Sequence, residues 1–265
     1  MDNENVLEPV RELADGSPQN EEIPPFTFLG TGYTGTAELV SALERNWQEG
    51  KAQLFSGALT DWYHSWDPDT ARKCRAAQEE GARESGSEDV IYRKLLCQLD
   101  PQRRSFAWRG LVFESLPALG KELLGRLWDR DGSLSAYCLS IPENRLLSHF
   151  AAFTGDEALA RSAALVEGSY ELERDNGTDL QMTLYLMAYT LSGQKILLLD
   201  GERFSSVTEL ADYMRGMVAE SYERFRGLCR RLADDGDGLD PQLEAWFIAL
   251  GRQDELDRWR QSLNG

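Results

Sequence analysis

The pattern of apolar positions along this chain repeats one short phrase three times. Each copy has an aromatic residue, small hydroxyl residues nearby, Leu six positions after the aromatic and an apolar residue ten positions after it. The aromatic residues stand 80 (113 − 33) and 91 (204 − 113) positions apart. Such recurrence is typical of stacked helical units. The copies are Tyr33-Thr34…Leu39…Leu43, Phe113…Ser115…Leu119…Leu123 and Phe204-Ser205…Leu210…Met214.

The residue types of each phrase predict the first turns of a helix. A hydroxyl side chain can accept a hydrogen bond from the open backbone N–H groups at a helix start, and the two apolar residues share one helical face. Glu38 and Glu209 precede the first Leu in two copies, where a negative charge suits the helix N-terminus. Short apolar runs before the phrases predict strands at 26–29, at 106–108 with 111–113, and at 195–199.

Proline punctuation predicts where several further helices begin. Asp67-Pro68 and Asp240-Pro241 each place an acidic cap before Pro at the first helical position. Ile141-Pro142 is expected to open a helix as well, and Gly30-Thr31-Gly32 is expected to be a turn. A long apolar helix at 180–191 parallels one at 88–98, because both precede an extended run and the next phrase.

Together these signals predict a mainly α-helical protein of two to three related helical-bundle units connected by short strands. The expected units are 25–110, 111–200 and a truncated unit at 201–265 that can pack as one domain with the second. Residues 1–24 are rich in Asp, Asn, Glu, Gly, Ser and Pro, so this segment is expected to be a disordered acidic tail.

Charge narrows the possible partners. The chain carries 45 acidic and 28 basic residues, for a net charge of −17. Such a surface repels phosphate backbones and anionic lipids, so neither nucleic acid nor membrane is an expected partner. Local basic clusters such as Arg103-Arg104 are expected to form surface ion pairs with the plentiful acidic residues. No apolar stretch approaches the ~18 residues of a membrane-spanning helix.

Cysteine usage and the N-terminal sequence favour a cytoplasmic protein. The four cysteines are far apart and form no zinc-type spacing, which predicts reduced thiols that pack as small apolar residues. The acidic N-terminal stretch lacks the apolar core of a signal peptide.

One stretch has the composition of a reactive site. A His beside three carboxylates can ligate a metal or act as a general base, and Asp61 and His64 would share one helix face. The alternative is that Asp67 only caps a helix and that His64 is exposed. The chain has no P-loop, dinucleotide fingerprint or nucleophile elbow, so no cofactor is expected and a metal-dependent hydrolase stays an alternative interpretation. Its candidate residues are Asp61, His64, Asp67 and Asp69.

Two aromatic stripes are candidates for binding a protein partner. Exposed aromatic side chains in a groove are common anchors for a partner helix or peptide. The same spacing also suits core packing, and that alternative stays open here. The candidates are Trp47, Trp62, Tyr63 and Trp66 in the first stripe, and Trp246 and Trp259 in the second.

Residues 29–66 contain a pattern of apolar, glycine and tryptophan positions that does not depend on the three phrases. Its positions are Glu38-Leu39, Leu43, Asn46-Trp47, Gly50-Lys51, Leu54, Gly57-x-Leu59 and Trp62. This pattern resembles helical accessory modules of large bacterial multidomain proteins, where such modules accompany protein-kinase-like or heat-shock chaperone-type ATPase domains. The later copies share only the Leu pair and, near 225–250, Phe225, Leu228 and Trp246. The resemblance implies an accessory or interaction role and transfers no catalytic residue.

The sequence therefore predicts a non-enzymatic protein-interaction or adaptor module, accessory to a larger bacterial signalling or chaperone system. Such a module should have an exposed apolar groove between its units. A structural subunit of a homo-oligomeric assembly is a further alternative, and it predicts a broad, flat apolar face.

Overall fold

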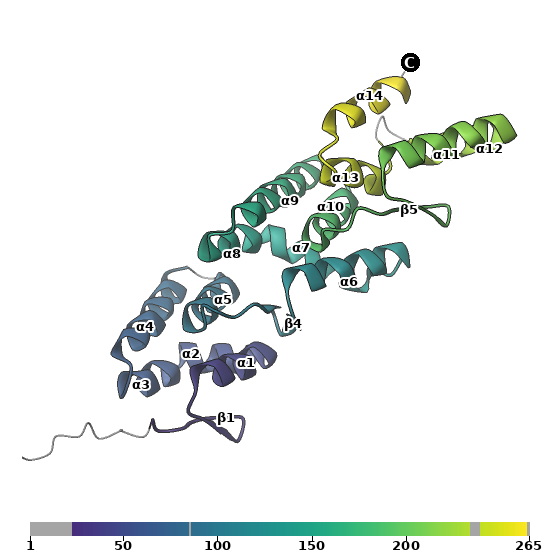
Figure 1. Cartoon of the computed structure of the whole chain (residues 1–265). Coiled ribbons are helices and arrows are strands. Elements are labelled where there is room, and N and C mark those ends of the chain that lie inside the picture. The colour runs from purple at the N-terminus through teal and green to yellow at the C-terminus, as the bar shows by residue number, and fades with distance from the viewer. Residues whose placement is uncertain (1–22, 85, 234–238, 264–265) are drawn as a thin grey trace, which may run out of the picture.

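The computed structural model describes residues 23–84, 86–233 and 239–263 and confirms a mainly α-helical fold (Figure 1). It contains 14 α-helices, is 70% helical and has three small antiparallel hairpins in the described part of the chain. The expected tail, residues 1–24, lies outside the described residues except for its last two positions. No helix in the described ranges combines the length and apolar character that crossing a bilayer requires.

Three hairpins of identical construction mark the repeat. Each has two strands of three residues joined by a two-residue turn. The first strand begins opposite the aromatic residue of the phrase, so Phe26 pairs with Tyr33, Phe106 with Phe113 and Leu197 with Phe204. The phrase thus marks the same structural position three times. The strands are β1 (Phe26–Phe28), β2 (Thr31–Tyr33), β3 (Phe106–Trp108), β4 (Leu111–Phe113), β5 (Leu197–Leu199) and β6 (Glu202–Phe204).

The hairpin turns are Leu29-Gly30, Arg109-Gly110 and Asp200-Gly201. Both residues of every turn have positive φ, between 48° and 87°. This is the geometry of tight hairpins whose twist matches the flanking strands. The expectation of a turn at Gly30-Thr31-Gly32 is therefore wrong: the chain turns one residue earlier, and Thr31 already pairs with Phe28.

Each hairpin opens a helical unit. The first two units have the same order, in which the η1–α7 segment of the second unit takes the place of α2 in the first. The first unit continues with α1 (Thr36–Arg45), α2 (Trp47–Phe55), α3 (Ala58–His64), α4 (Pro68–Arg83) and α5 (Glu88–Leu99). The second continues with α6 (Leu116–Trp128), the 3-10 turn η1 (Gly132–Leu134), α7 (Ser135–Glu143), α8 (Leu146–Thr154), α9 (Glu157–Asn176) and α10 (Gln181–Ser192). The third has α11 (Val207–Glu220), α12 (Tyr222–Leu232), α13 (Pro241–Ala249) and α14 (Gln253–Leu263).

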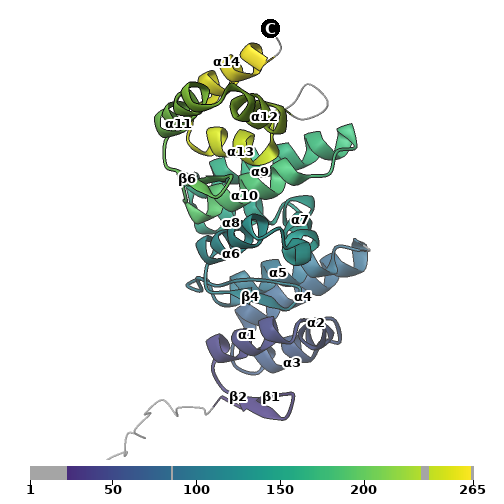
Figure 2. The ribbon, with the colours of Figure 1, turned by 90° about the vertical axis from the view of Figure 1, so that its right-hand side faces the viewer.

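Equivalent helices make equivalent contacts. The third and fourth helices of every unit pack together, as α3 with α4, α8 with α9 and α13 with α14. The fifth helix packs on the first helix of its own unit and on the third helix of the next, so α5 contacts α1 and α8, and α10 contacts α6 and α13. Figure 2 shows the resulting stack, which rises unit by unit from the β1–β2 hairpin to α14. The hairpins straddle the expected boundaries at 110/111 and 200/201.

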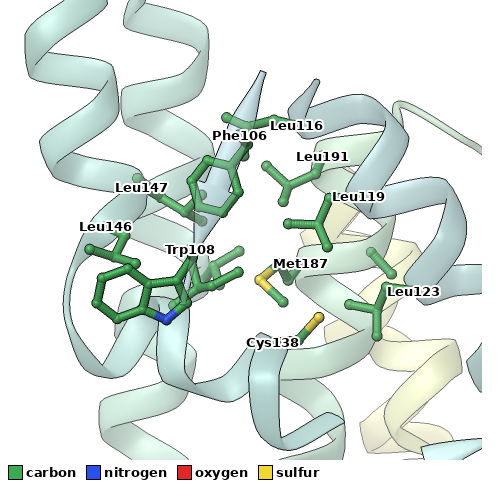
Figure 3. Packing of buried hydrophobic residues seen from close by; sticks show 14 of the residues in the cluster. Phe106, Trp108, Leu116, Leu119, Leu123, Cys138, Leu146, Leu147, Met187 and Leu191 are labelled. Atoms are coloured by element: carbon green, nitrogen blue, oxygen red, sulfur yellow. The ribbon is translucent and has the colours of Figure 1, made fainter. Parts of the chain in front are cut away.

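The junction of the first two units is a continuous apolar core (Figure 3). Phe106 and Trp108 of β3 are buried among leucines of α6, α8 and α10. Gly120 of α6 permits close approach, because a Cβ there would lie 2.4 Å from the backbone N of Ser192 in α10. The helices of the second unit are thus tied directly to the hairpin that opens it.

Helix starts follow the predicted caps at α4, α6 and α13, whereas α1 begins after Gly35 without a side-chain cap. Asp67, Ser115 and Asp240 each accept a hydrogen bond from a backbone N–H in the following turn. The helix predicted to open at Ile141-Pro142 is wrong, because both residues lie in the last turn of α7. Both side chains are buried, so tertiary packing outweighs the local proline signal there.

Candidate functional site

The acidic stretch at 61–69 spans the end of α3 and the start of α4. Asp67 caps α4 by accepting a hydrogen bond from the N–H of Thr70 at 3.0 Å, and this bond holds the pKa of Asp67 below its usual value. Asp69 pairs with Arg72 at 2.5 Å, while Asp61 and His64 are exposed. In the described ranges, no three His, Cys, Asp or Glu side chains are placed to hold a metal ion together. The convergence that the hydrolase alternative requires does not occur in these ranges.

The first aromatic stripe lies in the core and not on a binding surface. Trp47, Trp62 and Tyr63 are at most 8% exposed, and Trp66 is half-buried against them. The indole of Trp47 donates to Asp89 at 2.8 Å and that of Trp62 to the carbonyl of Pro24 at 2.6 Å. The expectation that this stripe is an exposed anchor is therefore wrong. A helical period places side chains on one face, but it does not say whether that face meets the core or a partner.

The second stripe also packs inside the protein. Trp246 is fully buried and donates to the carbonyl of Lys195 at 3.0 Å. Trp259 is half-buried, and its ring centroid lies 5.6 Å from that of Phe247. The predicted partner-binding role is corrected: Trp246 is a core residue bonded to the segment before β5, and Trp259 packs on Phe247 of α13.

A hollow surface is found instead where the first two units meet. Three adjoining hollows share Phe150 and Phe153 of α8, and we call them together the inter-unit groove. The largest, about 1050 Å³, runs from the 101–104 loop past the start of α6 to the start of α9. A smaller one, about 110 Å³, lies between α5 and α8. Phe153 is 40% exposed and supplies an apolar wall.

Arg93 of α5 lies beneath this groove with an incompletely satisfied guanidinium. Its side chain is 8% exposed, and its Cζ atom lies 5.4 Å from the ring centroids of both Phe106 and Phe150. Nη1 lies 3.0 Å from the sulfur of Cys97, and Nη2 is buried without a hydrogen-bond partner. A buried cation that lies beside two rings and keeps one donor unpaired lowers the stability of the fold.

Glu44 of α1 is a buried carboxylate beside Arg93. Its Oε2 accepts from Arg103 at 2.6 Å, whereas its Oε1 is 4.0 Å from Arg93 Nη1 and has no hydrogen bond. Burial raises the pKa of Glu44, although Arg103 and Arg93 oppose that effect. The hydroxyl of Tyr137, whose pKa burial also raises, is likewise buried and unpaired. Glu44, Arg93 and Tyr137 therefore each keep one buried polar atom without a hydrogen-bond partner.

The groove lining is basic in an acidic protein. Its charged residues are Arg93, Lys94, Arg103 and Arg104, against only two carboxylates, Asp100 and Asp156. Arg103 forms an ion pair with Glu44, as predicted for this basic cluster. Arg104, by contrast, is exposed and has no carboxylate partner in the described part of the chain. Partial burial and the nearby charge of Lys94 lower the pKa of His149, a further lining residue.

Sequence reasoning missed most of this site. The Arg103-Arg104 pair was visible as a basic cluster, but nothing local distinguishes the paired arginine from the free one. Phe150 and Phe153 read as ordinary apolar positions of a helix. Only the packing of α8 against α5 brings them beside Arg93.

The chain matches no family model, no curated protein and no solved structure. The resemblance of residues 29–66 to accessory modules therefore stays a prediction.

Proposed function

We propose that this chain is a non-enzymatic protein-interaction module that binds a short segment of a partner protein in the inter-unit groove. The observation that carries the proposal is the lining of the groove, where the exposed Arg104, without a carboxylate partner in the described residues, lies in one hollow with the 40%-exposed Phe153. In keeping with the resemblance above, we place the module as a cytoplasmic accessory of a larger bacterial system.

The lining favours a segment that combines an acidic group with an apolar side chain. A carboxylate can accept from the exposed Arg104, and charge-assisted bonds of this kind are stronger than neutral ones. An aliphatic or aromatic side chain can cover Phe153 and the exposed edge of Phe150. A peptide carries few charges, so it is repelled less by a chain of net charge −17 than a nucleic acid would be.

A selection experiment tests this proposal. Random peptides displayed on phage are selected on the full-length protein, and the recovered peptides are measured by fluorescence anisotropy. We expect sequences in which Asp or Glu flanks an apolar residue, with a loss of about tenfold or more in affinity for Arg104→Glu and for Phe153→Asp.

Arg226→Glu is the matched control, because Arg226 is an exposed arginine of α12 without an ion pair in the described residues. It makes the same change in net charge away from the groove. Failure to recover peptides, or equal losses for Arg226→Glu and Arg104→Glu, would contradict the proposed function.

A further inference from the structure

The fifth helix of a unit covers the first helix in both places where it is present. In the first unit, the Tyr92 hydroxyl of α5 donates to the carbonyl of Leu43 in α1 at 3.2 Å, and its ring centroid lies 4.9 Å from that of Trp47. In the second unit, α10 lies directly against Gly120 of α6. The covered face of the first helix is thus part of the core.

The first helix of the third unit lacks this cover. Its main contacts are with α12 and β6, and α14 packs on α13 instead. In the described ranges, no helix takes the place on α11 that α5 and α10 take on α1 and α6.

Residues at the same distance from the phrase aromatic are less exposed in the first two units than in the third. Fourteen residues after the phrase aromatic stand Trp47, Leu127 and Val218, and they are 3%, 9% and 44% exposed. Ten residues after it, Leu43 and Leu123 are buried, but Met214 is only half-buried. Apolar side chains remain at these positions of α11, although no helix in the described chain covers them as α5 and α10 cover α1 and α6.

These side chains form one continuous stripe along α11, which we call the α11 stripe. Its members recur at helical spacing on a single face, as the contact face of an amphipathic helix does. Val218, which is 44% exposed, is its most accessible member. The stripe consists of Val207, Ala211, Met214 and Val218.

We propose that the α11 stripe binds an amphipathic helix of a partner protein, which takes the place of a fifth helix in the third unit. The other two units define the shape of this ligand: α5 and α10 are both 12 residues long and present an apolar face to the first helix. The charge of α11 indicates which residues should flank the apolar face of the partner helix. α11 carries Glu209, Asp212 and Glu220 against one Arg, so basic residues should flank the apolar face of the partner helix.

This site is separate from the inter-unit groove and does not depend on the proposed function above. It predicts binding of a preformed or induced helix, whereas the groove is expected to select an acidic segment. The two proposals therefore call for oppositely charged ligands.

A peptide carrying the α5 sequence tests the proposal. The probe is a fluorescein-labelled peptide of residues 87–100 with Cys97→Ser and two added lysines at each end, titrated with the full-length protein and followed by anisotropy. We expect saturable binding that Val218→Arg weakens by about tenfold or more, together with a gain of peptide helicity in circular dichroism.

Leu172→Arg is the matched control, because Leu172 is an exposed apolar residue of α9, 64% accessible, and lies outside the stripe. It should leave the affinity unchanged. No saturable binding, or equal binding by wild type and Val218→Arg, overturns the proposal. Light scattering adds a further outcome: a wild-type dimer that Val218→Arg converts to a monomer would make a second copy the occupant and overturn the assignment to a partner helix.

Discussion

Trp62 and Trp246 make the same hydrogen bond in the first and third units. The indole of Trp62 donates to the carbonyl of Pro24, and that of Trp246 donates to the carbonyl of Lys195. Each carbonyl lies two residues before the first strand of its unit. The third helix thus fixes the point at which the chain enters each hairpin. In the second unit, Phe150 takes this place through a ring contact with Phe106.

Replacing either tryptophan by phenylalanine should destabilise the fold. Trp62→Phe and Trp246→Phe each remove a buried donor and part of a ring, so the free energy of unfolding should fall by about 2 kcal/mol. Urea denaturation followed by circular dichroism measures this change.

Trp66→Phe provides the comparison, because the buried indole N–H of Trp66 already lacks a hydrogen-bond partner. Its removal sacrifices no hydrogen bond and should cost clearly less. If Trp66→Phe were as damaging as Trp62→Phe, ring volume and not the shared hydrogen bond would account for the effect.

The hairpin turns predict a second set of stability changes. Gly30→Ala and Gly201→Ala place a Cβ at φ of 80° and 83°, which should cost roughly 1–2 kcal/mol each. Leu29→Asn should instead stabilise the fold, because Leu29 also has positive φ and Asn tolerates that conformation. We expect the free energy of unfolding to rise by about 0.5 kcal/mol.

Gly216→Ala controls for the glycine changes. Gly216 is exposed in the middle of α11, and a Cβ there meets no atom within 4 Å. Alanine has the higher helix propensity, so this variant should gain about 0.5–1 kcal/mol. Thermal unfolding of the set measures the order, and a destabilised Gly216→Ala alongside neutral turn variants would contradict the backbone argument.

Asp89 should make stability depend on pH. It accepts from Trp47 at 2.8 Å and from Arg109 at 3.0 Å, and it pairs with Lys51 at 2.7 Å, so it ties α2 and the second hairpin to α5. Burial opposes ionisation of this carboxyl, but the three donors outweigh burial and hold its pKa below the usual 3.8. Folding therefore favours the ionised form.

The direction of the pH effect follows from the difference between the folded and unfolded pKa of Asp89. The contribution of Asp89 is fully present above its unfolded pKa and is lost as the pH falls through the lower folded pKa. Asp89→Asn should cost roughly 1–3 kcal/mol at pH 7, and its difference from wild type should shrink below about pH 4. Asp69→Asn, which breaks only an exposed pair with Arg72, should stay within about 0.5 kcal/mol of wild type. A pH-independent difference for Asp89→Asn would argue against an ionic contribution.

The sequence by itself determined the mainly α-helical fold and several helix starts. Asp67-Pro68 and Asp240-Pro241 begin helices in the structure, and the three phrase aromatics occupy one register position in three hairpins. These features depend on residues within a few positions of one another. Cap hydrogen bonds and helical periodicity are therefore readable before the chain folds.

Only the tertiary structure decided which apolar faces are covered and which charges are paired. Trp246 and Val218 both belong to apolar helical faces, yet one is fully buried and the other is 44% exposed. Arg103 and Arg104 are neighbours in the sequence, yet of the two only Arg103 forms an ion pair with Glu44. Burial and ion pairing depend on elements that are distant in the chain, and no local pattern encodes which of them will meet.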